Sequence, residues 1–442
     1  MSLKQTFKVQ PKGALQGSIR VPGDKSISHR AIIMGAIAEG TTQIKGFLEG
    51  EDSLATLEAF RAMGVTISEP NNGSLRIQGV GLHGLQAPQQ PLDMGNSGTA
   101  MRLLCGLLAA QKFSSVLVGD ESLSTRPMQR ITDPLKTMGA QIELEEGGLA
   151  PIKISPARLK AISYDMPVAS AQVKSCLLLA SLYINGTSTI VEPAPCRNHT
   201  ELMLQGFAYP LLEISGSKVE LGGGGRLKAC DIDIPADISS AAFFLVGASI
   251  APGSDLTLEH VGINPTRVGV VNILRAMGAN IEYLREYEVG GEAVADIRVR
   301  YAPLHGITIP VDQVPLAIDE FPALFIAAAC AEGTTTLSGA EELKVKESDR
   351  IQAMADGLKT LGVKHQVTPD GIIITGSATS PFINGGEIDS KGDHRIAMAF
   401  TIAGLVAERA ITILDCNNVA TSFPGFAELA QTSGIDLKVS ES

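Results

Sequence analysis

Apolar and polar positions follow one another along this chain in a pattern that occurs six times. A short apolar strand ends in polar residues, an apolar helix follows, a turn leads to another strand, and a second helix ends near a glycine. The glycines at these six helix ends are Gly64, Gly139, Gly206, Gly278, Gly362 and Gly434. A repeat of this length is a β/α unit that needs neighbours to bury its apolar faces. The pattern therefore predicts an α/β protein with helices packed under sheets.

The first and fourth copies remain similar in sequence. Residues 18–40, SIRVPGDKSISHRAIIMGAIAEG, match residues 231–253, DIDIPADISSAAFFLVGASIAPG. A chain of 442 residues exceeds one hydrophobic core, so two domains of three repeats each are expected. A division near residue 230 suffices if each half folds alone. The sequence leaves open whether the first strand packs with the second half instead.

The net charge of −11 argues against a nucleic-acid partner, since such proteins need a dense basic surface. A local basic pocket for small anions is still compatible with it. The six cysteines form no CxxC pair and lie mostly in apolar stretches, which favours reduced thiols. The apolar runs are shorter than the ~18 residues of a membrane span, and no signal peptide is apparent. We therefore expect a soluble, cytoplasmic protein.

Charged and polar residues interrupt the repeat at one kind of position, the start of a helix. Four such clusters occupy residues 24–30, 95–102, 170–174 and 344–350. Helix N-termini bind anions because their N–H groups are unpaired and carry a partial positive charge. Capping is the simpler interpretation for Asp24, Ser26 and Ser170. The second cluster, GNSGTAMR, is not a P-loop because the GK[ST] ending is missing.

The fourth cluster has the strongest excess of charge. Two cations, Lys346 and Arg350, stand at a helix start, where each costs ~0.3–1 kcal/mol unless an anion answers it. The negative charge of Glu347 offsets one of the two cations. The remaining positive charge suggests an anionic ligand. The helix that follows has its predicted core stripe at Ile351, Met354, Leu358 and Leu361.

Three further departures from the repeat complete the set. Arg126 directly precedes a helix that is predicted to begin at Pro127. Arg395 follows Asp393 and His394 at the start of another helix, and Asp319 lies in a buried apolar run, where a carboxylate needs a partner or a function.

These departures supply six cations and two acids, which suit a substrate with several phosphate and carboxylate groups. The cations are Lys25, Arg30, Arg126, Lys346, Arg350 and Arg395, and the acids are Asp319 and Glu347. No set of His, Cys, Asp or Glu has metal-site spacing, so no metal is expected. No dinucleotide-binding motif is present, so no nicotinamide or flavin cofactor is expected.

Seven segments together resemble the 5-enolpyruvylshikimate-3-phosphate (EPSP) synthase family, and they run through the whole chain in family order. They are VPGDKSISHRA, GNSGTAMRLL, STRPM, ASAQVKS, LKVKESDR, GDHRIAMAF and TSFPGF. The resemblance implies a two-domain inside-out α/β barrel of six βαβαββ repeats, crossed twice by the chain. Domain one would be residues 1–21 plus 237–442 and domain two residues 22–236, with the active site in the cleft between them.

The resemblance also implies an activity of aromatic amino-acid biosynthesis, the transfer of the enolpyruvyl group of phosphoenolpyruvate to the 5-hydroxyl of shikimate 3-phosphate. Asp319 would take the hydroxyl proton, and Glu347, helped by Lys25, would protonate phosphoenolpyruvate. The substrate-binding residues would be Lys25, Ser26, Arg30, Asn96, Gly98, Arg126, Ser170, Ala171, Gln172, Arg197, Asp319, Lys346, Arg350 and Arg395. A monomer without a cofactor, a nucleic-acid partner or a membrane partner is expected.

The chain departs from the better-known branch of the family at Ala171, Glu342 and Thr421, where that branch has Ser, Asn and Lys. These residues resemble the second branch. Gly98 leaves room for phosphoenolpyruvate and its mimic glyphosate, so inhibition by glyphosate is predicted. The alternatives are a UDP-N-acetylglucosamine enolpyruvyl transferase, which carries a loop Cys that GDESLSTRPM lacks, and a non-catalytic binding scaffold.

Overall fold

The protein, seen here as a computed structural model that describes residues 4–441, divides into two compact units. Unit 1 takes the described residues up to Pro22, then Ala236–Tyr287 and the chain from Ala293 onward. Unit 2 takes Gly23–Pro235 together with Glu288–Glu292. No helix within residues 4–441 has the length and apolar character that crossing a membrane requires.

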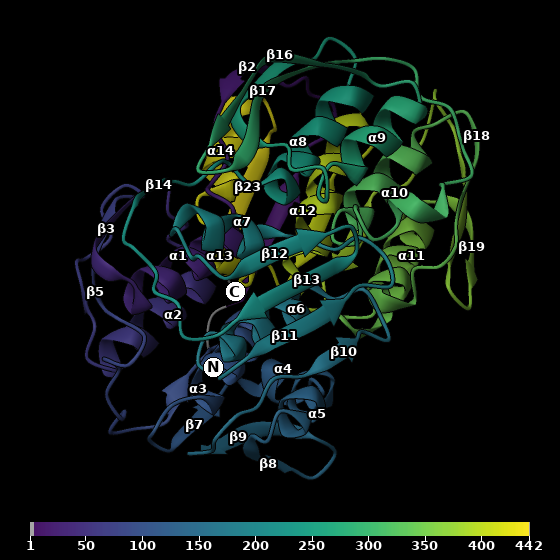
Figure 1. Cartoon of the computed structure of the whole chain (residues 1–442). Coiled ribbons are helices and arrows are strands. Elements are labelled where there is room, and N and C mark those ends of the chain that lie inside the picture. Colours follow the sequence, from purple (N-terminus) through teal and green to yellow (C-terminus); the bar gives the residue numbers. More distant parts are fainter. Residues whose placement is uncertain (1–3, 442) are drawn as a thin grey trace. The chain divides into compact units, whose positions relative to one another are not determined.

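Unit 2 contains three four-stranded sheets built to one plan (Figure 1). In each sheet the first two strands are parallel and the other pairs are antiparallel. The strand orders are β14 (Asp231–Asp233)–β3 (Glu39–Lys45)–β5 (Leu75–Val80)–β4 (Thr66–Ile67), then β6 (Leu92–Asp93)–β7 (Ser115–Val118)–β9 (Leu149–Ser155)–β8 (Gln141–Glu145), and β10 (Ser163–Asp165)–β11 (Thr187–Val191)–β13 (Lys218–Gly222)–β12 (Leu212–Ser215). The helices are α1 (Lys25–Ile37), α2 (Glu51–Ala62), α3 (Gly98–Ala109), α4 (Glu121–Ser124), α5 (Gln129–Thr137), α6 (Ala171–Ser181) and α7 (His199–Gly206).

Unit 1 also has three sheets: two follow the same plan, and the remaining one has three strands, all antiparallel. Their orders are β2 (Gln16–Ile19)–β15 (Asp255–Gly262)–β17 (Glu292–Arg300)–β16 (Asn280–Val289), then β18 (Gly333–Leu337)–β20 (Gly371–Gly376)–β19 (Lys364–Thr368), and β21 (Gly386–Asp389)–β22 (Ile411–Leu414)–β1 (Gln5–Val9)–β23 (Leu437–Glu441). The helices are α8 (Ile238–Ile250), α9 (Gly269–Ala276), η1 (Val311–Gln313), α10 (Phe321–Ala329), η2 (Glu341–Val345), α11 (Arg350–Thr360), α12 (His394–Ala403), η3 (Gly404–Val406), α13 (Val419–Ser422) and α14 (Phe426–Ser433). Six sheets with helices packed against them confirm the predicted α/β repeat.

The first helix of each repeat lies in the interior of its unit. In unit 1, α8, α10 and α12 pack on one another, and every residue of α8 and α10 is buried. Such helices are apolar on all sides because no face meets water. Five of the six first helices begin with an Asp or Ser whose side chain accepts a backbone N–H, at Asp24, Ser97, Ser170, Asp237 and Asp393. These caps fix where the helices start, and the candidate site residues stand beside them.

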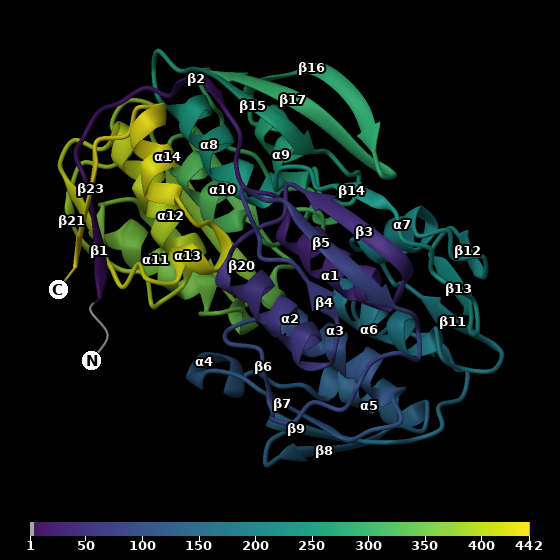
Figure 2. The ribbon, with the colours of Figure 1, turned by 90° about the vertical axis from the view of Figure 1, so that its left-hand side faces the viewer.

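The first and fourth repeats exchange their first strands. β2, from the SIRVP segment, pairs in parallel with β15, whereas β14, from the DIDIP segment, pairs in parallel with β3. The two segments match as sequence copies, but each completes the sheet of the other copy. β1 likewise pairs with β22 and β23 of the last repeat, so purple β1 lies among the yellow strands in Figure 2. The sequence left open whether the first strand of the chain packs with the second half. It does, since β1 and β2 both belong to unit 1.

Five of the six predicted terminal glycines have a positive φ just after a second helix: Gly64, Gly139, Gly278, Gly362 and Gly434. The sixth, Gly206, is the last residue of α7, so the helix ends there as predicted, but Gly206 does not take the left-handed position. Ala208 takes the left-handed position instead, with φ 53°, and Tyr209 N donates to Leu204 O as Val65 N donates to Phe60 O. The helix closure is therefore kept without its glycine.

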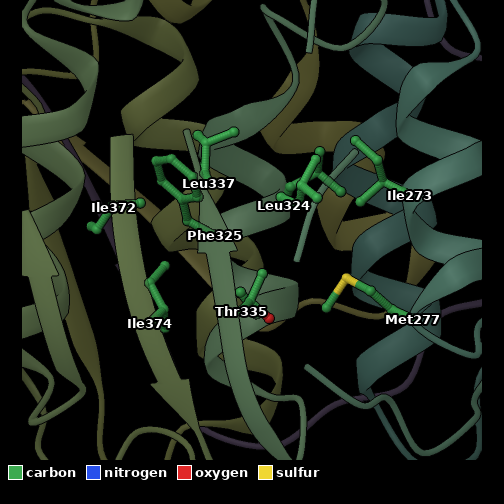
Figure 3. A pocket seen from close by; sticks show the side chains of 10 residues that line it. Ile273, Met277, Leu324, Phe325, Thr335, Leu337, Ile372 and Ile374 are labelled. Carbon is green, nitrogen blue, oxygen red and sulfur yellow. The ribbon is translucent and has the colours of Figure 1, made fainter. Parts of the chain in front are cut away.

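A narrow gap in unit 1 lies among α9, α10, β18 and β20 (Figure 3). It is lined by aliphatic and aromatic side chains such as Ile273, Leu324 and Phe325, and Thr335 brings the one hydroxyl. A water molecule does not fit into it. The gap is thus a packing defect between helices and sheet, and it offers nothing to a polar substrate.

Candidate active site

The start of α1 holds Lys25 and Arg30 in two different settings. Asp24 caps the helix by accepting from Ile27 N, which confirms the capping interpretation for Asp24. Lys25 Nζ lies 2.9 Å from Asp52 Oδ2, so a carboxylate of α2 offsets a cation at the positive end of α1. Arg30 Nη1 donates to the Ser26 carbonyl at 2.9 Å, as expected for residues four apart on one helix face.

Arg30 is 3% exposed, and its other hydrogen bonds go to hydroxyl groups. Nε donates to Thr200 Oγ1 and Nη2 donates to Ser175 Oγ, each at 2.7 Å. Burial lowers the pKa of Arg30 to about 10, against the opposite effects of Glu201 and Asp24, and the charge of Arg197 contributes to the lowering. The guanidinium therefore stays charged at neutral pH, and its bonded partners leave that charge available to an anion.

His29 is a buried residue that was not assigned a function from the sequence. Its Nδ1 lies 2.8 Å from Thr56 Oγ1 of α2, and its Nε2 lies 3.4 Å from Ser97 Oγ, the cap of α3. Burial, followed by the charges of Lys25 and Arg30, lowers the pKa of His29 to about 3. The imidazole is thus neutral and ties three helices together at the site. The signal was its place within the SISHR segment.

The start of α3 brings together Asn96, Gly98 and Arg126. Asn96 Nδ2 donates to Asp120 Oδ2 and Asn96 Oδ1 accepts from Arg126 Nη2, both at 2.7 Å. A Cβ added to Gly98 would lie 3.4 Å from Arg126 Nη1, so the space above Gly98 adjoins this guanidinium. The predicted helix start at Pro127 is wrong: α5 begins at Gln129 after a Met128 cap, since Arg126 and Pro127 belong to the preceding turn.

Ser170 caps α6, and its Oγ accepts from Val173 N at 3.4 Å. Ala171 is the first residue of that helix and Gln172 the second. Gln172 Oε1 accepts from Arg102 Nη1 at 2.6 Å, and its Nε2 donates to Thr99 Oγ1 at 3.1 Å. Arg102 was not among the predicted site residues, although it lies four residues after Gly98 on the same helix face.

Lys174 differs from its neighbours because it is buried and paired. Its Nζ forms ion pairs with Glu192 and with Glu201, the latter at 2.5 Å. The segment between these two glutamates carries Arg197, which is half-buried. Lys174 therefore does not join the half-buried polar groups at the start of α6.

In unit 1, Arg350 gathers three carboxylates at the start of α11. Its Nε lies 2.8 Å from Asp393 Oδ2, its Nη2 lies 2.6 Å from Glu347 Oε2, and its Nη1 lies 3.4 Å from Asp319 Oδ1. Burial alone would lower the pKa of Arg350, but the carboxylates outweigh it and the pKa is raised. Burial would raise the pKa of Asp393, yet the charge of Arg350 holds it below its usual value.

Lys346 and Arg395 complete this cluster from either side of Asp319. Lys346 Nζ lies 3.3 Å from Asp319 Oδ1 and 3.8 Å from Glu342 Oε1. Arg395 Nη1 donates to the Asp319 backbone carbonyl at 2.8 Å. The structure thus brings together all the site residues that the sequence placed in this half. Asp393 was the missed partner, and its place as an Asp before an apolar helix was the available signal.

The predicted core stripe of α11 is confirmed, since Ile351, Met354, Leu358 and Leu361 are all buried. Within residues 4–441, no group of three or more potential metal-binding side chains occurs. The six cysteines are free thiols, and four of them are buried: Cys105, Cys176, Cys330 and Cys416.

The family model for EPSP synthase (3-phosphoshikimate 1-carboxyvinyltransferase) matches residues 9–429. The chain belongs to the EPSP synthase family. A 3-phosphoshikimate 1-carboxyvinyltransferase of Methylococcus capsulatus is 63% identical over 98% of both chains. The same-named protein of Alkalilimnicola ehrlichii is 64% identical over 98% of this chain and 96% of its own.

Solved structures agree with this assignment. EPSP synthase from Acinetobacter baumannii is 57% identical, with a TM-score of 0.89 over 99% of this chain and 100% of that one. The enolpyruvyl transferase NikO from Streptomyces tendae covers both chains completely with a TM-score of 0.80, but at 16% identity it supports the fold alone.

Two of the departures from the better-known branch of the EPSP synthase family have clear surroundings. Glu342 stands in η2 near Lys346, so it adds a carboxylate to the unit 1 cluster. Thr421 is buried in α13, and its hydroxyl donates to Asn418 O at 2.7 Å. The donor of this hydroxyl is therefore used locally, at the start of α13.

Proposed function

We propose that this chain transfers the enolpyruvyl group of phosphoenolpyruvate to the 5-hydroxyl of shikimate 3-phosphate, releasing phosphate, in aromatic amino-acid biosynthesis. The family and the full-length relatives that bear the name 3-phosphoshikimate 1-carboxyvinyltransferase support this reaction. The observation that carries it at the level of residues is the cluster of Asp319, Glu347 and Arg350. It holds two carboxylates, which are partly exposed, against one buried cation.

Such a cluster can divide acid and base work between its two carboxylates. The side chain of Asp319 is 17% exposed and that of Glu347 is 24% exposed, whereas that of Arg350 is 1% exposed. Both acids can therefore reach a ligand while the guanidinium stays fixed below them. Carboxylates whose surroundings differ take opposite proton-transfer roles in many enzymes.

The residues of unit 2 supply the binding of shikimate 3-phosphate in this proposal. Arg30 and Arg197 influence each other electrostatically, and an anion that contacts both would offset their repulsion. Ser26, Ser170 and Gln172 offer hydroxyl and amide groups for the sugar-like ring. By the family resemblance, Asn96, Gly98, Arg126, Arg350 and Arg395 serve phosphoenolpyruvate, and Lys25 and Lys346 serve both substrates.

The proposed reaction is an addition followed by an elimination. Asp319 takes the proton of the 5-hydroxyl, and that oxygen forms a bond to C2 of phosphoenolpyruvate as Glu347, helped by Lys25, protonates C3. The adduct then loses phosphate, which takes the proton from Asp319, while Glu347 takes back one proton of the new methyl group, and the double bond is restored. Each positioned acid or base is worth ~10²–10⁴ in rate.

Glu347 must carry a proton to act as the acid, although it faces Arg350 at 2.6 Å. A bound phosphoenolpyruvate supplies the reason, because its negative charge next to the cluster disfavours a second anion on Glu347. The arginines also hold two mutually repelling substrates in place and stabilise charge that develops in the transition state.

The test is phosphate release from phosphoenolpyruvate with shikimate 3-phosphate, beside a control with UDP-N-acetylglucosamine. We expect phosphate with shikimate 3-phosphate alone. Phosphate in the control alone would favour the other enolpyruvyl transferase, and no phosphate in either would favour a binding scaffold. We also propose that the protein is cytoplasmic, monomeric and free of a cofactor. Cell fractionation tests its location, gel filtration tests its oligomeric state, and an activity assay after chelation tests for a bound metal.

A further inference from the structure

Lys174 is the buried cation of unit 2 that the proposed reaction does not use. It lies in α6, is 1% exposed, and contacts Glu192 and Glu201. Burying an ammonium and two carboxylates costs several kcal/mol per ion unless they pair closely. Burial would lower the pKa of Lys174, but Glu201 and its other neighbours outweigh that effect and the pKa is raised. Lys174, Glu192 and Glu201 thus form a buried set of paired charges. The segments that carry the two glutamates are held against α6 by these pairs.

The two glutamates stand at the two ends of one segment. Glu192 directly follows β11 and Glu201 lies in the first turn of α7, so residues 193–200 are tied to α6 at both ends. Glu192 Oε2 also accepts from Cys196 N at 3.1 Å, which fixes the backbone one residue before Arg197. At the far end, His199 Nδ1 lies 2.6 Å from Glu292 Oε1.

The same helix turn also holds Arg30. Ser175, next to Lys174, accepts from Arg30 Nη2 at 2.7 Å and lies 2.7 Å from Thr200 Oγ1, next to Glu201. α6 and α7 therefore hold both arginines. Ser175 and Thr200 contact Arg30 directly. Their neighbours Lys174 and Glu201 pair with each other and hold the segment that carries Arg197.

We infer that Lys174 is a positioning residue that sets Arg197 for recognition of the phosphate group of shikimate 3-phosphate. The inference rests on the proposed function. Lys174 itself is enclosed and touches no substrate. It acts by holding the 193–200 segment against α6, and its loss would let Arg197 move away from its place near Arg30.

The test is the kinetics of Lys174→Met, with the KM for each substrate measured separately. We expect the KM for shikimate 3-phosphate to rise about tenfold or more, and the KM for phosphoenolpyruvate and kcat to stay within about threefold. Lys174→Arg, which keeps the charge, should recover most of the loss. Lys218→Met is the matched control, because it removes a lysine–glutamate pair on β13, the strand that pairs with β11. The side chain of Lys218 is 43% exposed, and the variant should change neither KM.

If Lys174→Met does not fold, the charge-balanced variant Lys174→Met with Glu192→Gln replaces it. A double-mutant cycle with Arg197→Ala excludes a merely structural role. In the Arg197→Ala background, Lys174→Met should add less than about twofold to the KM for shikimate 3-phosphate. Independent effects that multiply would overturn the inference, as would equal increases in both KM values or an unchanged KM.

The wild-type assay separates the two levels of the proposal. A wild-type protein that turns over shikimate 3-phosphate, beside a Lys174→Met variant with the same KM, overturns the role of Lys174 alone. A wild-type protein that neither turns over nor binds shikimate 3-phosphate, by titration calorimetry, overturns the proposed function and this inference with it.

Discussion

Arg30 in unit 2 and Arg350 in unit 1 are both buried arginines near the start of a helix, but they differ in their partners. Arg30 donates to two hydroxyls and a backbone carbonyl. Arg350 contacts the carboxylates of Asp319, Glu347 and Asp393. The pKa of Arg30 is lowered to about 10 and that of Arg350 is raised. Neutral partners leave the charge of Arg30 for a ligand, whereas carboxylates satisfy that of Arg350.

The same contrast extends to neighbouring residues. Arg126 donates to Asn96 and to Ser122 Oγ in unit 2, whereas Lys346 faces Asp319 and Glu342 in unit 1. Lys25, which pairs with Asp52, is an exception in unit 2. In the proposed function, the partners of the unit 2 residues therefore favour anion binding, and the carboxylates of unit 1 supply the proton transfer.

The largest expected effect is on turnover when the acids of unit 1 are neutralised. Asp319→Asn and Glu347→Gln should each lower kcat by ~10²–10⁴, because each removes a positioned proton-transfer group. Steady-state phosphate release measures this. Glu428→Gln is the matched control, since Glu428 is an exposed carboxylate of α14, outside the cluster, and should change kcat little. Full activity in both acid variants would refute the mechanism.

The next effect compares the stabilities of two arginine variants. Arg350→Met should lower the free energy of unfolding by about 3–5 kcal/mol, because it leaves Asp393 buried without its cation. Arg30→Met leaves two hydroxyls and a backbone carbonyl, all uncharged, without their donor, so it should cost less than half as much while raising the KM for shikimate 3-phosphate. Urea unfolding and kinetics check both, and equal losses of stability would contradict the contrast.

Local signals made the helix starts of the site predictable, whereas its partners lie far away in sequence. Asp24 and Ser170 cap helices that the sequence located, because capping depends on neighbouring residues alone. Asp393 is 43 residues from Arg350 and Thr200 is 170 from Arg30. The pattern of a single segment does not specify a partner so far away in the sequence. Asp393 was therefore not assigned to the site, and neither was His29, whose partner Thr56 lies in another helix.

A smaller effect is expected from His29 on the pH dependence of stability. Its pKa is about 3 in the folded protein and 6.5 ordinarily, so the unfolded chain binds the proton first. Stability is therefore lost as pH falls below about 6.5, by about 2 kcal/mol between pH 7 and pH 5. His29→Gln removes this slope, which urea unfolding at both pH values measures. A wild-type protein and variant with the same slope would show that His29 is not buried in its neutral form.

The smallest effect concerns the one helix end that lacks its glycine. Ala208→Gly should raise the free energy of unfolding by up to about 1 kcal/mol, because φ 53° strains a residue with a Cβ. Gly64→Ala is the reverse control and should lower it by at least as much, because the added Cβ would also lie 3.0 Å from Gln86 Cδ. Thermal unfolding of both variants tests this, and a destabilised Ala208→Gly would mean that the Ala208 methyl group contributes packing.

Ala208 and the exchanged strands show why parts of the fold could not be predicted. In the third repeat α7 ends at Gly206, but the left-handed residue after the helix is Ala208. An alanine in this conformation cannot be recognised from the sequence. The VPGD and IPAD segments are so alike that either first strand fits either sheet. Only pairing with β15 and β3 distinguishes them, and that depends on contacts distant in sequence.

The division of work between the two sets of residues is tested most directly by titration calorimetry of shikimate 3-phosphate into Asp319→Asn and Arg30→Met. Asp319→Asn should bind within about threefold of the wild-type protein although it turns over slowly. Arg30→Met should bind at least about tenfold more weakly, a loss of about 1.4 kcal/mol. Equal losses of affinity in the two variants would contradict the account.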